Sequence, residues 1–149
     1  MKNLATNRKA FFDYEIIEKY EVGIILLGSE VKSVKNGKVS LKESFISIKD
    51  KKVIWKQGYI DIPLTVVFDR PSETRERTLL LNKSEINKLE KNVSLNGLTI
   101  VPLNIYLNDK NKIKMEIALA RGKKLYDKRE DLKNKDLKRE SEQNIKNFY

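Results

Sequence analysis

Alternating apolar and polar positions dominate the first 120 residues and predict a chain built mainly of β-strands. Segments rich in β-branched and aromatic residues recur between short polar turns. The polar turns at 49–51 and 108–111 are expected to join neighbouring strands into hairpins. The strands expected from this pattern cover residues 12–20, 22–27, 45–48, 52–61, 79–81, 98–107 and 112–120.

Two short helices are expected between these strands. Ser29 fits the N-cap position of the first, because Val31 and Val34 then share one helix face. Gly37 can supply the positive φ that ends this helix. The second helix is expected to begin at residue 84 and to end near residue 97.

Residues 62–77 contain Pro63, Pro71 and several charges, so we expect an irregular loop there. About six strands in hairpin order, with about two or three short helices, predict a mainly β fold. The expected architecture is a small antiparallel barrel of the oligonucleotide-binding type, in which closure removes exposed strand edges. This barrel domain would occupy residues 1–120.

Residues 121–149 have a different character and predict a basic tail. They contain ten Lys or Arg and six Asp or Glu, with few apolar residues, so they have little to bury against a core. If the tail is helical, four cations lie within roughly 20° of one another around the helix axis. They are Lys128, Lys135, Arg139 and Lys146. Such a stripe favours an extended polyanion as partner, and the alternative is a solvated tail with no partner.

Composition narrows the class of function. The chain has 149 residues, of which 40% are hydrophobic and 35% charged, which is typical of a globular protein. The net charge is +10, and the tail accounts for +4 of it, so residues 1–120 are basic in their own right. This charge favours nucleic acid or another anionic surface as partner.

The side chains that most catalysis requires are missing from the sequence. It has no cysteine and no histidine, which excludes disulfides, thiolate metal sites and an imidazole base. The carboxylates are scattered among basic residues, and the sequence has no glycine-rich phosphate loop. We therefore expect no enzyme activity, no cofactor and no metal site. Apolar runs are short and the first residues lack a signal-peptide pattern, so we expect a cytoplasmic monomer with no membrane partner.

Basic residues form four clusters in addition to the tail. Each cluster alone is typical of a solvated surface, but together they favour RNA or DNA binding. Because Arg75 and Arg77 alternate as the chain leads into the predicted strand at 79–81, both are expected to point to one face. The clusters comprise Arg8 and Lys9 after Asn7; Lys32, Lys35 and Lys38; Arg75 and Arg77; and Arg121, Lys123 and Lys124.

Specific strings carry more information than charge. They occur in one order along nearly the whole chain: NRKA at 7–10, EVGI at 21–24, GSEVKS at 28–33, RERTLLLN at 75–82, PLNIY at 102–106 and ALARGKKLYDKR at 118–129. Together they closely resemble the small protein B family of SsrA-binding proteins, which partner transfer-messenger RNA in bacterial ribosome rescue. The resemblance implies an oligonucleotide-binding barrel, not an enzyme, that binds the tRNA-like domain of this RNA and delivers it to stalled ribosomes.

The resemblance also implies partners for individual residues. Asn7, Glu21, Leu80, Asn82 and Lys114 match family positions associated with RNA binding. Asparagine and lysine can donate to sugar or phosphate, whereas a glutamate can only accept, from a base edge, a ribose hydroxyl or a basic neighbour. For Leu80, a place in the core remains the alternative.

The tail is the second region to which the resemblance gives a partner. It implies a tail that is disordered when free and helical in the empty mRNA channel of the small ribosomal subunit. Tyr126, Asp127, Lys128 and Arg129 match the part that the family places near the decoding centre. Tyr126 could stack on an exposed base there or anchor the first turn of the tail.

Three features depart from the family pattern. Phe11-Phe12 replaces a basic residue and a histidine, Thr78 replaces a lysine, and the loop at 61–74 is unusual. Three other classes of function remain open at this level. They are a general RNA-binding barrel, a carboxylate-dependent nuclease, and a protein-interaction module whose tail folds on a protein partner.

Overall fold

Nine strands and three helices make up the part of the chain that the computed structural model describes, residues 2–68 and 70–123. In chain order they are β1 (Lys2–Thr6), α1 (Arg8–Asp13), β2 (Tyr14–Ile24), α2 (Gly28–Lys35), β3 (Val39–Ser40), β4 (Phe45–Lys49), β5 (Lys52–Lys56), β6 (Tyr59–Ile60), β7 (Arg77–Leu80), α3 (Lys83–Asn96), β8 (Thr99–Leu107) and β9 (Ile113–Gly122).

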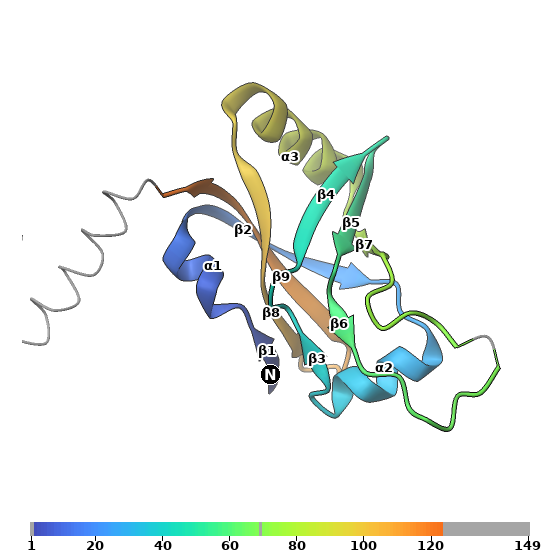
Figure 1. Cartoon of the computed structure of the whole chain (residues 1–149). Helices are drawn as coiled ribbons and strands as arrows, with labels where there is room; N and C mark the ends of the chain where they lie inside the picture. The colour runs from blue at the N-terminus through green and yellow to red at the C-terminus, as the bar shows by residue number, and fades with distance from the viewer. Residues whose placement is uncertain (1, 69, 124–149) are drawn as a thin grey trace, which may run out of the picture.

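Seven of these strands form one antiparallel sheet in the order β1-β8-β9-β2-β7-β5-β4, and β3 pairs with β6 in a separate ribbon. The prediction of a mainly β antiparallel fold is therefore confirmed. The prediction of a closed barrel is wrong. The sheet curls until β4 comes near β8, but no described hydrogen-bonded ladder joins these two strands (Figure 1). Strands β1 and β4 consequently remain edges.

The N-terminal region differs most from the prediction, because one long strand replaces two short ones. β2 runs without interruption from Tyr14 to Ile24, and the residues before it form α1. Asn7 accounts for this helix: its Oδ1 accepts from the Ala10 N–H at 3.4 Å, and its Nδ2 donates to the Pro102 carbonyl at 2.9 Å. Asn7 therefore caps α1 and fastens it to β8.

The ends of the other helices partly match expectation. The N-cap of α2 is Leu27 rather than Ser29, because the Glu30 carboxylate accepts from the Leu27 N–H at 2.9 Å. Gly37 has φ +77°, as predicted for the residue that ends this helix. α3 begins after Asn82, whose Oδ1 accepts from the Glu85 N–H at 2.9 Å. In Figure 1, α2 and α3 lie at opposite ends of the curled sheet.

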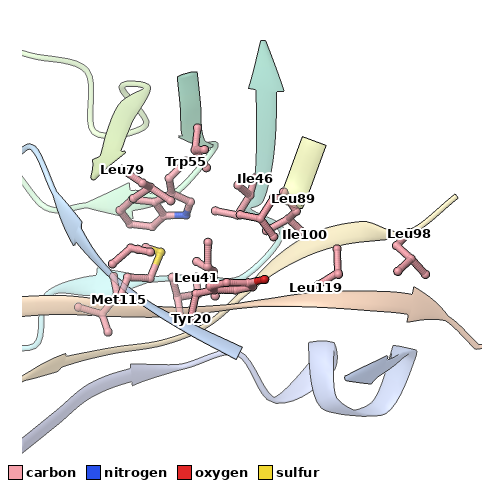
Figure 2. Close-up of a cluster of buried hydrophobic side chains, with 14 of the residues drawn as sticks. Tyr20, Leu41, Ile46, Trp55, Leu79, Leu89, Leu98, Ile100, Met115 and Leu119 are labelled. Carbon is pink, nitrogen blue, oxygen red and sulfur yellow. The ribbon is translucent and has the colours of Figure 1, made fainter. Parts of the chain in front are cut away.

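The main core fills the inside of the curl. Figure 2 shows Trp55 and Leu79 facing Met115 and Tyr20, with Leu89 of α3 covering one end. Trp55, Leu89 and Met115 are completely buried. Burial of large side chains of this kind stabilises the fold by roughly 1.5–3 kcal/mol each. Side chains thus fill the inside of the curled sheet. A binding surface must therefore lie on the outer face of the sheet or along its rims.

The segment between β6 and β7 is irregular, as predicted. The Arg70 guanidinium donates to the carbonyls of Ile62 and Pro63, both at 2.7 Å, and so braces the loop from inside. Three apolar side chains project outward: Leu64 is 92%, Val67 74% and Phe68 88% exposed.

Within residues 2–68 and 70–123, no helix is long and apolar enough to cross a membrane. The same residues contain no grouping of three or more acidic side chains that could hold a metal ion.

Candidate nucleic-acid interface

The outer face of β8, β9 and β2 has two ends with different properties. At one end, Val101, Leu103, Ala118 and Ala120 pack with Ala10 of α1, which covers them. At the other end, the outward side chains are mostly polar, and α1 approaches them at Lys19, whose Nζ lies 5.9 Å from the centre of the Phe11 ring. We call this second end the open face. It comprises Lys19, Glu21, Gly23, Leu80, Asn104, Tyr106, Lys114 and Glu116.

Strand register places four residues of the open face in one row. Tyr106 pairs with Lys114, Lys114 with Gly23, and Gly23 with Leu80, so the row crosses β8, β9, β2 and β7. Directly paired residues project from the same side of a sheet. Gly23 leaves room in this row, because a Cβ atom there would lie only 3.3 Å from Leu80 Cδ1. Leu80 is 55% exposed and therefore belongs to the surface rather than the core.

A shallow depression lies beside this row. It has a volume of about 770 Å³ and is open to solvent. Three of its lining residues are lysines, which can each neutralise a phosphate. The lining residues are Glu21, Tyr106, Asn108, Asp109, Lys110, Lys112 and Lys114.

Hydrogen bonds order the polar side chains of the open face. The Tyr106 hydroxyl donates to Glu21 Oε2, and Asn104 Nδ2 donates to Glu116 Oε1 at 3.1 Å. Lys19 Nζ lies 3.8 Å from the same Glu116 oxygen. Burial raises the pKa of the Tyr106 hydroxyl far above its ordinary value of 10.0, and the hydrogen bond to Glu21 raises it further. Tyr106 therefore stays protonated and remains a donor at physiological pH.

Three of the five residues predicted to bind RNA from the family resemblance come together on this surface. They are Glu21, Leu80 and Lys114. Asn82 follows Leu80 by two residues and is exposed at the N-terminus of α3. Its Oδ1 is used by the helix cap, while none of the described residues accepts from its Nδ2. Asn82 can therefore still donate to a ligand.

Asn7 lies elsewhere and has a structural role, because both of its side-chain polar atoms are engaged in capping α1 and holding it to β8. Arg8 and Lys9 are exposed and line a separate hollow of about 390 Å³ between α1 and the segment around β3. Lys32 and Lys38 are exposed and Lys35 is half-buried, all at or just after α2. Neither group belongs to the open face.

The prediction that Arg77 binds RNA is wrong. Arg75 lies just before β7, and both arginines point toward Glu30, but Arg77 lies in the core with its side chain completely buried. Its Nε donates to Glu30 Oε2 at 2.8 Å, and its guanidinium lies 5.2 Å from the centre of the Trp55 ring. Arg77 therefore holds the core together and cannot reach RNA in the folded protein. Arg75 is partly committed as well, because it donates to Glu30 Oε1 at 2.6 Å.

The last predicted cations lie where the sheet ends. Arg121 is exposed, with its Nη1 3.4 Å from Glu15 Oε2. The Lys123 N–H donates to the Asp13 carbonyl at 2.9 Å, so the ordered chain continues past the predicted domain boundary at Ala120. The remaining predicted residues lie outside the part of the chain that is described. They are Lys124, Tyr126, Asp127, Lys128, Arg129, Lys135, Arg139 and Lys146.

Sequence reasoning gave no role to several residues of this interface, including Asn104, Tyr106, Lys110 and Lys112. A signal for two of them was present, because Asn104 and Tyr106 alternate with the buried Ile105 and Leu107. Such alternation predicts that both side chains lie on the face opposite the core.

Comparison with known proteins finds relatives that match nearly the whole chain. The family model described as SmpB protein matches residues 4–147. The SsrA-binding protein of Helicobacter hepaticus is 52% identical over 146 residues, which cover 97% of this chain and 94% of that protein. The SsrA-binding protein of Nitratiruptor sp. is 47% identical over 149 residues, with 99% of each chain covered.

A solved structure agrees as well. It is described as "tmRNA-SmpB: a journey to the center of the bacterial ribosome", is 42% identical, and superimposes with a TM-score of 0.65 over 90% of this chain and 94% of the other. A family match over nearly the whole length, together with relatives of this similarity, identifies the chain as a member of the SmpB protein family.

Proposed function

We propose that this chain binds the tRNA-like domain of transfer-messenger RNA and delivers that RNA to stalled ribosomes for trans-translation. The family membership supports this function, and so do its relatives, which are SsrA-binding proteins. The observation on this chain that carries the proposal is the open face, where Glu21, Leu80 and Lys114 come together beside a hollow lined by lysines.

The open face suits an RNA surface for three reasons. Lys110, Lys112 and Lys114 can neutralise neighbouring phosphates, which supplies affinity. Glu21 discriminates, because a carboxylate rejects phosphate and accepts only from hydrogen-bond donors. Leu80 offers an apolar contact to a sugar or base at the far end of the row.

For the basic tail, residues 121–149, we propose a separate partner. It would enter the vacant mRNA channel of the small subunit and become helical there, with Tyr126, Asp127, Lys128 and Arg129 near the decoding centre. Ordering a chain costs on the order of 1–2 kcal/mol per residue, so helix formation would have to be coupled to binding. Lys128, Lys135, Arg139 and Lys146 would then face ribosomal RNA.

The protein would act in the cytoplasm by positioning other molecules, without chemistry of its own. Peptidyl transfer would belong to the ribosome and aminoacylation to a synthetase. The testing experiment is a reconstituted tagging reaction with ribosomes stalled on an mRNA that lacks a stop codon, and with charged transfer-messenger RNA. The full chain should support addition of the tag, and a chain ending after Lys123 should bind the RNA but fail to support tagging. Failure of the full chain to support tagging would overturn the proposal.

A further inference from the structure

We propose that Tyr106 is a positioning residue that directs the Glu21 carboxylate at a ribose 2′-hydroxyl of the bound RNA. This inference rests on the proposed function and adds a specificity-determining contact to it. The two side chains would form one unit, in which Tyr106 holds the acceptor and Glu21 makes the contact.

The arrangement of the two residues leaves one oxygen of Glu21 open. Tyr106 lies on β8 and Glu21 on β2, on opposite sides of β9, and the tyrosine hydroxyl donates to Glu21 Oε2. None of the described residues donates to Glu21 Oε1. Tyr106 is only 7% exposed, whereas Glu21 is exposed. A buried donor therefore fixes one oxygen and leaves the other facing solvent.

The surroundings select the kind of group that Oε1 can accept from. Lys110, Lys112 and Lys114 line the same hollow, so an RNA backbone held there brings its phosphates close to the carboxylate. A carboxylate repels phosphate and accepts a hydrogen bond only from a donor. In an RNA backbone, the donor next to each phosphate is the 2′-hydroxyl.

The shape of the surface favours a backbone group over a base. The hollow is open to solvent, and Tyr106, the aromatic residue of the open face, is too buried to stack on a base. A base edge would have to enter a pocket or lie on an aromatic ring to be read in this way. The acceptor therefore faces the part of RNA that distinguishes it from DNA.

A simpler interpretation is that Glu21 only satisfies the buried hydroxyl of Tyr106. A double-mutant cycle separates the two interpretations, because it measures whether the residues act on RNA as a unit. The proteins are the full-length wild type, Tyr106→Phe, Glu21→Gln and the double variant. In Glu21→Gln, Tyr106 would bind the amide oxygen and leave the amide N–H₂ facing the RNA donor.

The ligand is the tRNA-like domain of transfer-messenger RNA, made as all-ribose RNA and as a set of RNAs with single 2′-deoxy substitutions. Glu21→Gln should weaken binding of the all-ribose RNA roughly ten-fold or more, as expected for loss of a hydrogen bond to a charged group. Tyr106→Phe should weaken it several-fold, and the double variant should be no weaker than Glu21→Gln. At least one 2′-deoxy substitution should weaken binding to the wild type but not to either single variant.

Tyr59 provides a control, because its hydroxyl lies 3.4 Å from Asp61 Oδ1 in a tyrosine–carboxylate pair at the surface, away from the open face. Tyr59→Phe should leave RNA affinity unchanged, and thermal unfolding of each variant shows that it is folded. Additive effects in the cycle, or the same sensitivity to every 2′-deoxy substitution in wild type and variants, would overturn the inference. If the wild type itself does not prefer this RNA to an elongator tRNA, the proposed function fails instead.

Discussion

Arg77 Nε donates to Glu30 Oε2 at 2.8 Å, and both side chains are completely buried. The pair joins the first turn of α2 to the start of β7, which lie 47 residues apart in the chain. Arg77 also donates to the backbone carbonyls of Gly58 and Glu73, so its guanidinium is nearly fully satisfied. Arg75 donates to the second oxygen of Glu30 at 2.6 Å. Two arginines thus hold one buried carboxylate.

Removal of this carboxylate should be strongly destabilising. Glu30→Ala leaves a buried guanidinium without its counter-ion, which typically costs about 3–5 kcal/mol. Urea denaturation of the wild type and the variant measures the difference. Glu90→Ala is the control, because Glu90 pairs with Lys51 at 2.6 Å on the surface, where such pairs contribute about 0–1 kcal/mol. Equal losses in the two variants would contradict the role assigned to Glu30.

The same carboxylate should make stability depend on acid pH. Burial alone raises the pKa of Glu30, but hydrogen bonds from Arg75, the Leu27 N–H and Arg77 outweigh it, so the pKa lies below the ordinary value of 4.5. A lowered pKa in the folded state adds stability above about pH 4.5, and this contribution is lost as the pH falls through the folded-state pKa.

The measurement is the free energy of unfolding between about pH 3 and pH 7, for the wild type and Glu30→Gln. The slope of stability against pH at the acid end should be smaller in the variant. Glu18→Gln is the comparison, since the hydrogen bond from Lys88 at 2.9 Å also lowers the pKa of Glu18, but this half-exposed pair is screened by water and its loss should change the slope less. If the free energy of unfolding depends on pH in the same way in Glu30→Gln and in the wild type, this prediction is wrong.

Local patterns predicted much of this fold, and the failures have physical reasons. The turn at 49–51 and the helix from Asn82 to Gly97 depend on local signals, namely polar turn residues and caps, and both were predicted closely. β1 was missed because this short edge strand is defined only by its pairing with β8, about a hundred residues away. Closure of the barrel could not be judged either, because it depends on how strongly the whole sheet curls.

In the candidate site, too, local patterns predicted some features and missed those that depend on distant parts of the chain. Alternation predicted a common direction for Arg75 and Arg77, and both do reach Glu30, but it could not show that Glu30 neutralises Arg77 inside the core. Likewise, Leu80 could not be assigned to the core or the surface until its pairing with Gly23 was known. A charged side chain is normally expected to be exposed to solvent. A counter-ion from a distant part of the chain can nevertheless hold it in the core, as Glu30 does for Arg77.

Leu79 and Leu80 are adjacent but should respond differently to the same substitution. Leu79 is 3% exposed in the main core, whereas Leu80 is 55% exposed on the open face. Leu79→Ala should cost about 2–5 kcal/mol of stability. Leu80→Ala should change stability by about 0.5 kcal/mol or less while weakening RNA binding. Thermal unfolding and RNA titration of both variants check this, and a large loss of stability in Leu80→Ala would show that Leu80 belongs to the core.

Lys114 should contribute to RNA affinity as a phosphate contact. Lys114→Ala should weaken binding several-fold and lower the slope of log affinity against log salt concentration by about 0.7–0.9. Binding titrations at four or more salt concentrations measure both quantities. Lys51→Ala serves as the control, since Lys51 lies in the β4–β5 turn and contacts Glu90 and Asn87 of α3. A salt slope unchanged from that of the wild type would exclude a phosphate contact by Lys114.

The most direct test of the central claim is the affinity of the full chain for transfer-messenger RNA and for an elongator tRNA, measured across one salt series. A specific reader of transfer-messenger RNA should prefer it at every salt concentration, with the preference reduced by Glu21→Gln or Leu80→Ala. Equal affinity for the two RNAs at all salt concentrations would contradict the account and leave a general basic RNA-binding protein.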